Sequence, residues 1–130
     1  MAMEGVQNNP IQLSSDSEDD EIEVIAWDVP LTRHKASGKQ ALGIPARVVR
    51  ACLMQRPHIV SVEIDGDYER LEDWDLLWTH DRTTQCMFGH GWYKYVVEKQ
   101  LREGDEVSFV KHPHLLQFLV TITRREELGL

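Results

Sequence analysis

Residues 91–109, with the sequence GWYKYVVEKQLREGDEVSF, predict a short helix, a tight turn and a half-buried strand in that order. Three large side chains are spaced at i, i+3 and i+4, which places them on one helical face: Trp92, Tyr95 and Val96. The pair Gly104-Asp105 is typical of a turn. Val107 and Phe109 then alternate with polar residues, which indicates a strand with one buried face.

The pattern of this stretch, G-W-x-x-[aromatic]-V followed by L-x-x-G-D-x-V-x-F, resembles the plant B3 DNA-binding domain. A second match lies upstream, where Leu42-Gly43-Ile44-Pro45 resembles the L-x-[apolar]-P element at which a strand of that family runs into the first helix. The resemblance covers roughly residues 24–125. It implies the fold of the family, an open seven-stranded pseudobarrel, and its function, which is sequence-specific DNA binding.

Apolar alternation along the rest of the chain predicts a mainly β protein with about seven short strands and two short helices. The strand candidates lie within 22–31, 41–44, 60–64, 74–78, 84–88, 107–109 and 116–122. The first helix is expected to have Pro45 at its first position, where a missing N–H has no cost, and to end at Arg56-Pro57. Residues 32–40 are expected to form an exposed loop, and Asp65-Gly66 a hairpin turn.

The net charge of −8 opposes nucleic-acid binding, because phosphate contacts need a basic surface. The charge is unevenly distributed, since residues 1–23 hold seven acids and no Lys or Arg, while the remainder holds 15 acids and 14 bases. Five bases with no acid among them lie between positions 31 and 50: Arg33, Lys35, Lys39, Arg47 and Arg50. We expect residues 1–21 to be a disordered acidic tail, residues 22–125 the B3-like domain and residues 126–130 a C-terminal tail.

In the B3 family, two arms on one side of the barrel grip the major groove of double-stranded DNA, and the resemblance places the first arm at residues 32–40. Six of its side chains are candidates for DNA contact: Arg33, His34, Lys35, Ser37, Lys39 and Gln40. The strong bases can neutralise phosphates, and Arg or Gln can read purine edges through paired hydrogen bonds. Ser37-Gly38 would let the backbone come close to a partner. The alternative is a solvated loop whose bases have no role.

The resemblance places the second arm between Trp78 and Gln85, where the candidates are His80, Arg82, Thr83 and Gln85. Here the sequence departs from the family pattern, because Trp74-Asp75-Leu76-Leu77-Trp78 lacks the basic residue that usually precedes this arm. Asp81 also puts a negative charge at the expected tip, where it repels phosphate. A second hypothesis therefore stays open: a B3-like protein-interaction module with weak or lost DNA binding.

The acidic segment suggests a further hypothesis, a protein partner that binds residues Ser14 to Ile25. Ser14, Ser15 and Ser17 lie among acids, as acidophilic kinases prefer. The tetrad Ile22-Glu23-Val24-Ile25 resembles a SUMO-interacting motif, which adds a strand to the edge of the SUMO sheet. The alternative is that Val24 and Ile25 begin the first strand of the domain and that the acids form a solubilising tail.

No group of residues in the sequence specifies catalysis, a metal ion or a cofactor. His112-Pro113-His114 lacks a third metal ligand, Asp65-Gly66-Asp67 lacks the rest of a calcium loop, and Cys86 with His80 lacks an orienting group. No apolar run is long enough for a membrane span, and the N-terminus lacks the features of a signal peptide. Cys52 and Cys86 are expected to be buried thiols in a reducing compartment. We therefore expect a non-enzymatic transcription regulator in the nucleus, and the sequence sets neither its DNA site nor its oligomeric state.

Overall fold

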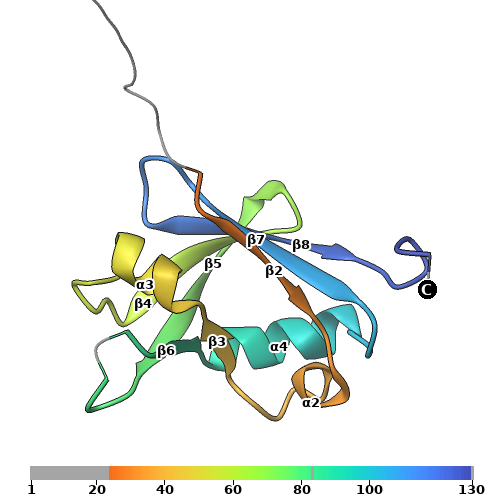
Figure 1. The fold of residues 1–130 in the computed structure, drawn as a ribbon. Coiled ribbons are helices and arrows are strands. Elements are labelled where there is room, and N and C mark those ends of the chain that lie inside the picture. Colours follow the sequence, from red (N-terminus) through yellow and green to blue (C-terminus); the bar gives the residue numbers. More distant parts are fainter. Residues whose placement is uncertain (1–23, 83, 130) are drawn as a thin grey trace, which may run out of the picture.

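The computed structural model describes residues 24–129 except residue 83, and over these residues it forms one seven-stranded sheet that curls into an open half-barrel (Figure 1). The strands in chain order are β2 (Ala26–Pro30), β3 (Leu42–Ile44), β4 (Ile59–Ile64), β5 (Asp67–Trp78), β6 (Cys86–Phe88), β7 (Glu106–Lys111) and β8 (Gln117–Thr123). Their spatial order is β2-β7-β8-β4-β5-β6-β3, so β2 and β3 are the two edges. Neighbouring strands are antiparallel, except that β4 and β8 are parallel.

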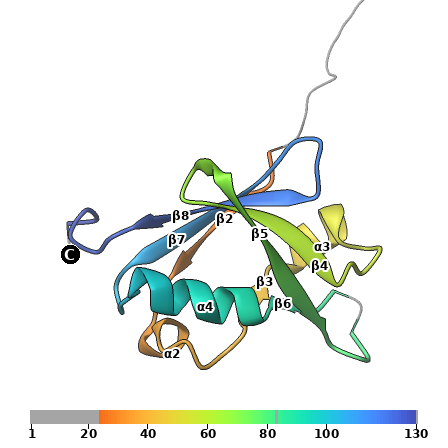
Figure 2. The same cartoon turned by 180° about the vertical axis from the view of Figure 1, so that it is seen from behind.

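Three helices accompany the sheet in the described residues: α2 (Arg33–Ala36), α3 (Ala46–Cys52) and α4 (His90–Lys99). α4 packs against β5, and Gly91 allows this close approach, because a Cβ at that position would lie only 2.3 Å from Cγ of Trp74. In Figure 2 the molecule is turned so that α4 lies toward the viewer. Within the described chain, no helix is long and apolar enough to cross a membrane.

The core is built from the inward residues of the strands and from one face each of α3 and α4. Stacked aromatic rings lie at its centre, with 4.9 Å between the ring centroids of Trp27 and Phe109 and 5.2 Å between those of Phe88 and Phe109. The helical face predicted from sequence is buried as expected: Trp92, Tyr95 and Val96. The predicted alternation of the first strand also holds, because its three apolar residues are buried: Trp27, Val29 and Leu31.

The prediction of a mainly β, seven-stranded pseudobarrel is confirmed. The prediction of two helices is wrong, because the described residues form three. The additional helix, α2, lies inside residues 32–40, which the sequence predicted to be a loop. It forms because Thr32 caps its N-terminus: Oγ1 of Thr32 accepts a hydrogen bond from the backbone N–H of Lys35, and the Thr32 carbonyl accepts one from Ala36. Pro45 occupies the N-cap position of α3, directly before the first helical residue, Ala46. The sequence had predicted Pro45 itself as the first helical residue.

Most strand boundaries differ by a few residues from the sequence prediction, and the differences at the starts of β5 and β8 have a clear structural basis. β5 runs from Asp67, well before the predicted residues 74–78, because Asp65 and Gly66 both adopt positive φ angles (56° and 79°) and turn the chain directly from β4 into β5. β8 begins at Gln117, so Leu116 lies outside the strand and is 40% exposed instead of sharing the buried face.

Asp105 follows Gly104 in the predicted turn and is fully buried. Its carboxylate accepts hydrogen bonds from the backbone N–H groups of Arg102 and Arg125, both at 2.9 Å, and from Nη1 of Arg124 at 3.1 Å. Burial acts to raise the pKa of this carboxyl, but the two backbone donors and Arg124 outweigh it and hold the pKa below its ordinary value. Asp105 therefore ties the end of α4 to the chain that follows β8.

The same turn also fixes the start of the first arm. The backbone N–H of Leu31 donates to the Asp105 carbonyl at 2.9 Å, and the N–H of Gly104 donates to the Leu31 carbonyl at 3.0 Å. The Gly-Asp turn therefore holds the chain at the point where it leaves β2, one residue before Thr32.

The acidic segment lies largely outside the described residues, and so do Ser14, Ser15 and Ser17. Of the Ile22-Glu23-Val24-Ile25 tetrad, only the last two residues are described. Val24 is exposed, and the Ile25 carbonyl accepts a hydrogen bond from the backbone N–H of Lys111 at 2.8 Å, directly before β2 begins. Ile25 thus already pairs with β7 through its backbone, while binding of a protein partner to residues 14–25 stays a prediction.

Candidate nucleic-acid interface

Two connections between strands project from the same end of the half-barrel, and β3 lies between them (Figures 1 and 2). The first joins β2 to β3 and contains α2, and the second joins β5 to β6 through residues 79–85. We call them the first arm (residues 32–40) and the second arm (residues 78–85), as the sequence placed them. β2 and β3 are the two edges of the open sheet, so the first arm spans its seam.

The first arm is held in shape by hydrogen bonds among its own residues. Besides the Thr32 cap, Oγ of Ser37 donates to the His34 carbonyl at 2.6 Å and accepts from the backbone N–H of Lys39 at 3.2 Å. The sequence assigned Ser37 to the approach of a partner, and in the structure its hydroxyl links the end of α2 to Lys39. His34 and Gln40, the other polar candidates of this arm, are exposed.

The bases of the first arm are available to an external anion. Arg33, Lys35 and Lys39 are all exposed, and no ion pair involves any of them within the described part of the chain. The bases that do form ion pairs lie outside both arms: Arg70, Lys99, Arg102 and Arg124. Neither arm therefore contributes a Lys or Arg to an ion pair between described residues.

The second arm closes through backbone hydrogen bonds. The N–H of Thr79 donates to the Gln85 carbonyl, and the N–H of Gln85 donates to the Arg82 carbonyl, both at 3.2 Å. His80, Arg82 and Gln85 are exposed, and Arg82 forms no ion pair with any described residue. The remaining candidate, Thr83, lies outside the described residues.

Arg56 supports the base of the second arm, a role that sequence reasoning missed. Its guanidinium lies over the Trp78 ring, 4.8 Å from the centroid, and its Nη2 donates to the Thr79 carbonyl at 3.3 Å. Trp78 in turn donates from Nε1 to the Pro57 carbonyl at 2.8 Å. In the sequence Arg56 marks only the end of a helix, and no local pattern connects it to a residue 23 positions away.

The acids near the second arm have different environments. Oδ1 of Asp75 accepts hydrogen bonds from the backbone N–H groups of His90, at 2.7 Å, and Gly91, at 3.3 Å, so its carboxylate caps the N-terminus of α4. Asp75, which lies in the strand that lacks the family's usual base, thus stabilises a helix and does not add an acid to the arm. Asp81, at the turn of the arm, is exposed.

The surface between the arms is hollowed on both sides of β3. One hollow, of about 350 Å³, lies at the seam between β2 and β3, and Lys35 of the first arm is part of its lining. The other, of about 370 Å³, is lined by residues of β6 and by Arg82, Thr84 and Gln85 of the second arm. Gly43 and Ile44 line both hollows, so one surface runs from the first arm to the second across β3.

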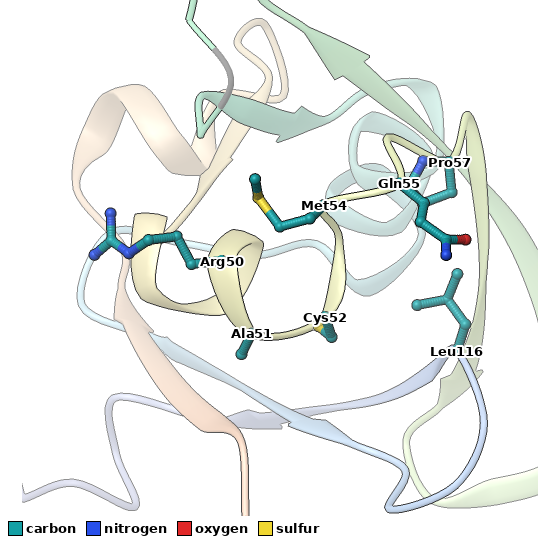
Figure 3. A pocket seen from close by; sticks show the side chains of 7 residues that line it. All are labelled: Arg50, Ala51, Cys52, Met54, Gln55, Pro57 and Leu116. Atoms are coloured by element: carbon teal, nitrogen blue, oxygen red, sulfur yellow. The ribbon is translucent and has the colours of Figure 1, made fainter.

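Burial makes both thiols less acidic than an exposed cysteine. Burial raises the pKa of Cys86 to about 11, which leaves it protonated at neutral pH. Cys52 lines a separate hollow of about 270 Å³ at the end of α3 (Figure 3); burial raises its pKa as well, and its Sγ donates to the Val48 carbonyl at 3.3 Å. Among the described residues, no three His, Cys, Asp or Glu side chains come together as metal ligands.

Gly38 determines how the first arm sits on α4. Its φ angle is +72°, which an L-residue rarely adopts, and a Cβ at this position would lie 3.5 Å from Cγ1 of Val96, an ordinary contact. Gly38→Val therefore has room for its side chain but strains the backbone by about 1 to 3 kcal/mol. We expect this strain to release the arm, so that trypsin cleaves after Arg33, Lys35 or Lys39 roughly tenfold faster, as followed by mass spectrometry.

A matched control for this experiment is Gly129→Val. Gly129 has a similar φ angle of +78°, has open space around it and lies outside both arms. The control is expected to leave cleavage of the first arm unchanged. Equal cleavage rates for intact protein and Gly38→Val would contradict the proposed role of Gly38.

No protein-family model matches the chain, and no curated protein matches it. Two solved structures from Arabidopsis share its fold. The hypothetical Arabidopsis thaliana protein At1g16640.1 superposes with a TM-score of 0.60 at 18% identity, covering 80% of this chain and 94% of that chain. FUS3, in its complex with DNA, superposes with a TM-score of 0.57 at 11% identity, covering 75% and 95%. The fold is therefore the B3 pseudobarrel that the sequence motifs implied.

Proposed function

We propose that this chain, which has the fold of the B3 DNA-binding domains, binds double-stranded DNA sequence-specifically and grips the major groove between its two arms. The observation that carries the proposal is the distribution of exposed bases. Arg33, Lys35 and Lys39 on one arm and Arg82 on the other have no ion-pair partner in the described chain. The surface between the arms is continuous across β3, and FUS3, which shares the fold, was solved in complex with DNA.

The side chains of the arms divide into two kinds of contact. Arg33, Lys35 and Lys39 neutralise phosphates and set the register of the protein on the duplex. Gln40 and Gln85 have the donor and acceptor that an adenine edge requires, and Arg82 has the paired donors that fit guanine. His34, His80 and Thr83 supply further polar contacts at the arms.

Asp81 restricts how the second arm can enter the groove. Its exposed carboxylate repels phosphates, so the arm must turn this side chain toward base edges. A carboxylate accepts a hydrogen bond from the cytosine N4 amine, and this contact would convert the unfavourable charge into base preference. The acid thereby favours sequence-dependent binding over uniform attraction to the backbone.

We place this activity in the nucleus, where a protein that recognises duplex DNA by sequence regulates transcription. The competing proposal is a protein-interaction module, favoured by the balance of acids and bases outside residues 1–23. The two proposals differ in what the first arm does, because only DNA binding requires its cations.

The deciding experiment is selection of the intact protein on a pool of random duplexes, beside the triple variant Arg33→Ala, Lys35→Ala, Lys39→Ala. We expect the intact protein to enrich one short motif and the triple variant to enrich none. A control with the same loss of charge, Arg50→Ala, Lys94→Ala, Arg125→Ala, removes exposed bases outside both arms that form no ion pair with a described residue, and it should enrich the same motif as the intact protein. Absence of enrichment by the intact protein would support the interaction module instead.

A further inference from the structure

Gly43 lies at the centre of β3 and has no structural reason to be a glycine. Its neighbours Leu42 and Ile44 are buried and Gly43 is exposed, so a side chain at this position would point outward. A Cβ built on Gly43 would meet no atom of the described residues within 4 Å, and its φ angle is not in the left-handed region. A glycine inside a strand weakens the strand, and it commonly marks a place where a ligand or another backbone approaches closely.

The position of Gly43 indicates which ligand approaches. It lines both hollows between the arms, with Lys35 beyond it on one side and Arg82 beyond it on the other. Lys35 and Arg82 are the only Lys or Arg residues in the described lining of the two hollows. The surface next to Gly43 is mostly apolar, since Pro45 lines one hollow and Met87 the other, and Met87 pairs with Gly43 in the sheet. The one acid in the described lining of the two hollows is Asp28, on the side of Lys35, and its carboxylate accepts a hydrogen bond from Oγ of Ser108 at 2.7 Å.

We propose that one sugar–phosphate strand of the duplex crosses β3 at Gly43, with a deoxyribose packed on the bare backbone and the flanking phosphates directed toward Lys35 and Arg82. The C–H surface of a deoxyribose fits an uncharged strip, whereas a phosphate placed on Gly43 itself would have no cation beside it. This inference rests on the proposed function and adds to it a third point of contact, midway between the arms.

Gly43→Val tests this contact with little risk to the fold. Valine favours strands and the site has open space, so the melting temperature is expected to stay the same or rise. The branched side chain would occupy the position of the sugar, and we expect DNA affinity to fall about tenfold or more. The dependence of affinity on salt should not change, because no cation is removed. Gly43→Ala should give a smaller loss in the same direction.

Leu71→Trp is the matched control, because it enlarges an already exposed side chain on β5, at a position that lines neither hollow. Affinities for the duplex selected by the intact protein are measured by fluorescence anisotropy at several salt concentrations. The control should bind like the intact protein.

The outcomes separate this inference from the proposed function. If the intact protein binds its duplex and Gly43→Val binds equally well, the contact at Gly43 is wrong and the function stands. If Gly43→Val binds more weakly and its salt slope falls by about one unit, the valine has displaced a phosphate from Lys35 or Arg82, and the assignment of a sugar to Gly43 is wrong. If the intact protein binds no duplex, the proposed function itself fails.

Discussion

Replacing Asp105 by alanine is expected to lower the free energy of unfolding by about 3 to 4 kcal/mol. The substitution leaves two backbone N–H groups without an acceptor and removes the partner of Arg124 at a fully buried position. Urea denaturation followed by tryptophan fluorescence measures the loss. Asp81→Ala, which removes an exposed acid, is the control and should change stability by less than about 0.5 kcal/mol.

Asp105 also predicts a pH dependence of stability. Because its pKa is lower in the folded protein than its ordinary value near 4, its contribution is complete above that value and is lost as the pH falls through the folded pKa. Asp105→Asn keeps a side-chain oxygen that can accept hydrogen bonds but has no carboxyl to protonate. The variant should be less stable than the intact protein at neutral pH and should lose less stability below about pH 4.

Two results would contradict this account of Asp105. The first is an Asp105→Ala variant within about 1 kcal/mol of the intact protein, which would mean that the turn does not depend on the carboxylate. The second is an equal loss of stability in acid for the intact protein and Asp105→Asn. Because the same turn holds Leu31, at the start of the first arm, we also expect Asp105→Ala to weaken DNA binding.

The largest expected effect on binding comes from the first arm. If its three bases and Arg82 each neutralise one phosphate, the slope of log affinity against log salt is about −3.6. Raising the salt from about 50 to about 200 mM would then lower the affinity of the intact protein roughly 150-fold. The triple variant Arg33→Ala, Lys35→Ala, Lys39→Ala keeps one contact, so the same change in salt should lower its affinity only about 3- to 4-fold.

The control for this titration is the triple variant Arg50→Ala, Lys94→Ala, Arg125→Ala, whose three bases are exposed and lie outside both arms. It has the same net charge as the arm variant, so an effect of overall charge would lower both slopes equally. We expect the control slope to stay near that of the intact protein. Equal slopes for the arm variant and the intact protein would show that the cations of the first arm do not contact phosphates.

Local patterns predicted the elements of the fold but not all of their ends. The spacing of Trp92, Tyr95 and Val96 predicted the buried face of α4, and the Asp65-Gly66 pair predicted the hairpin, because both depend on residues that are neighbours in the chain. α2 was missed although Thr32 is a good capping residue. A single turn of four residues, of which three are exposed and only Ala36 is half-buried, has no apolar period that could reveal it.

The candidate site was predictable in part. The acid-free run of bases and the resemblance to B3 domains placed both arms, and the structure gives these segments exposed side chains on the same end of the molecule. Their contact with DNA stays a prediction. The role of Arg56 beneath the second arm could not be inferred, because it depends on a contact with Thr79 across 23 residues of sequence.

The sequence by itself determined most of the secondary structure and the excess of bases in the first arm, because period, turn chemistry and charge are properties of short segments, and its resemblance to B3 domains implied the pseudobarrel. Only the tertiary structure decided what the isolated polar residues do. Asp75 lies in the strand that lacks the family's usual base, and it caps α4. Asp105 looked like a turn residue, and it ties the end of α4 to the chain that follows β8. Gly43 acquired a possible role only when the fold placed it between Lys35 and Arg82. Each of these roles depends on partners that are distant in the chain, and no local pattern encodes which distant residues meet.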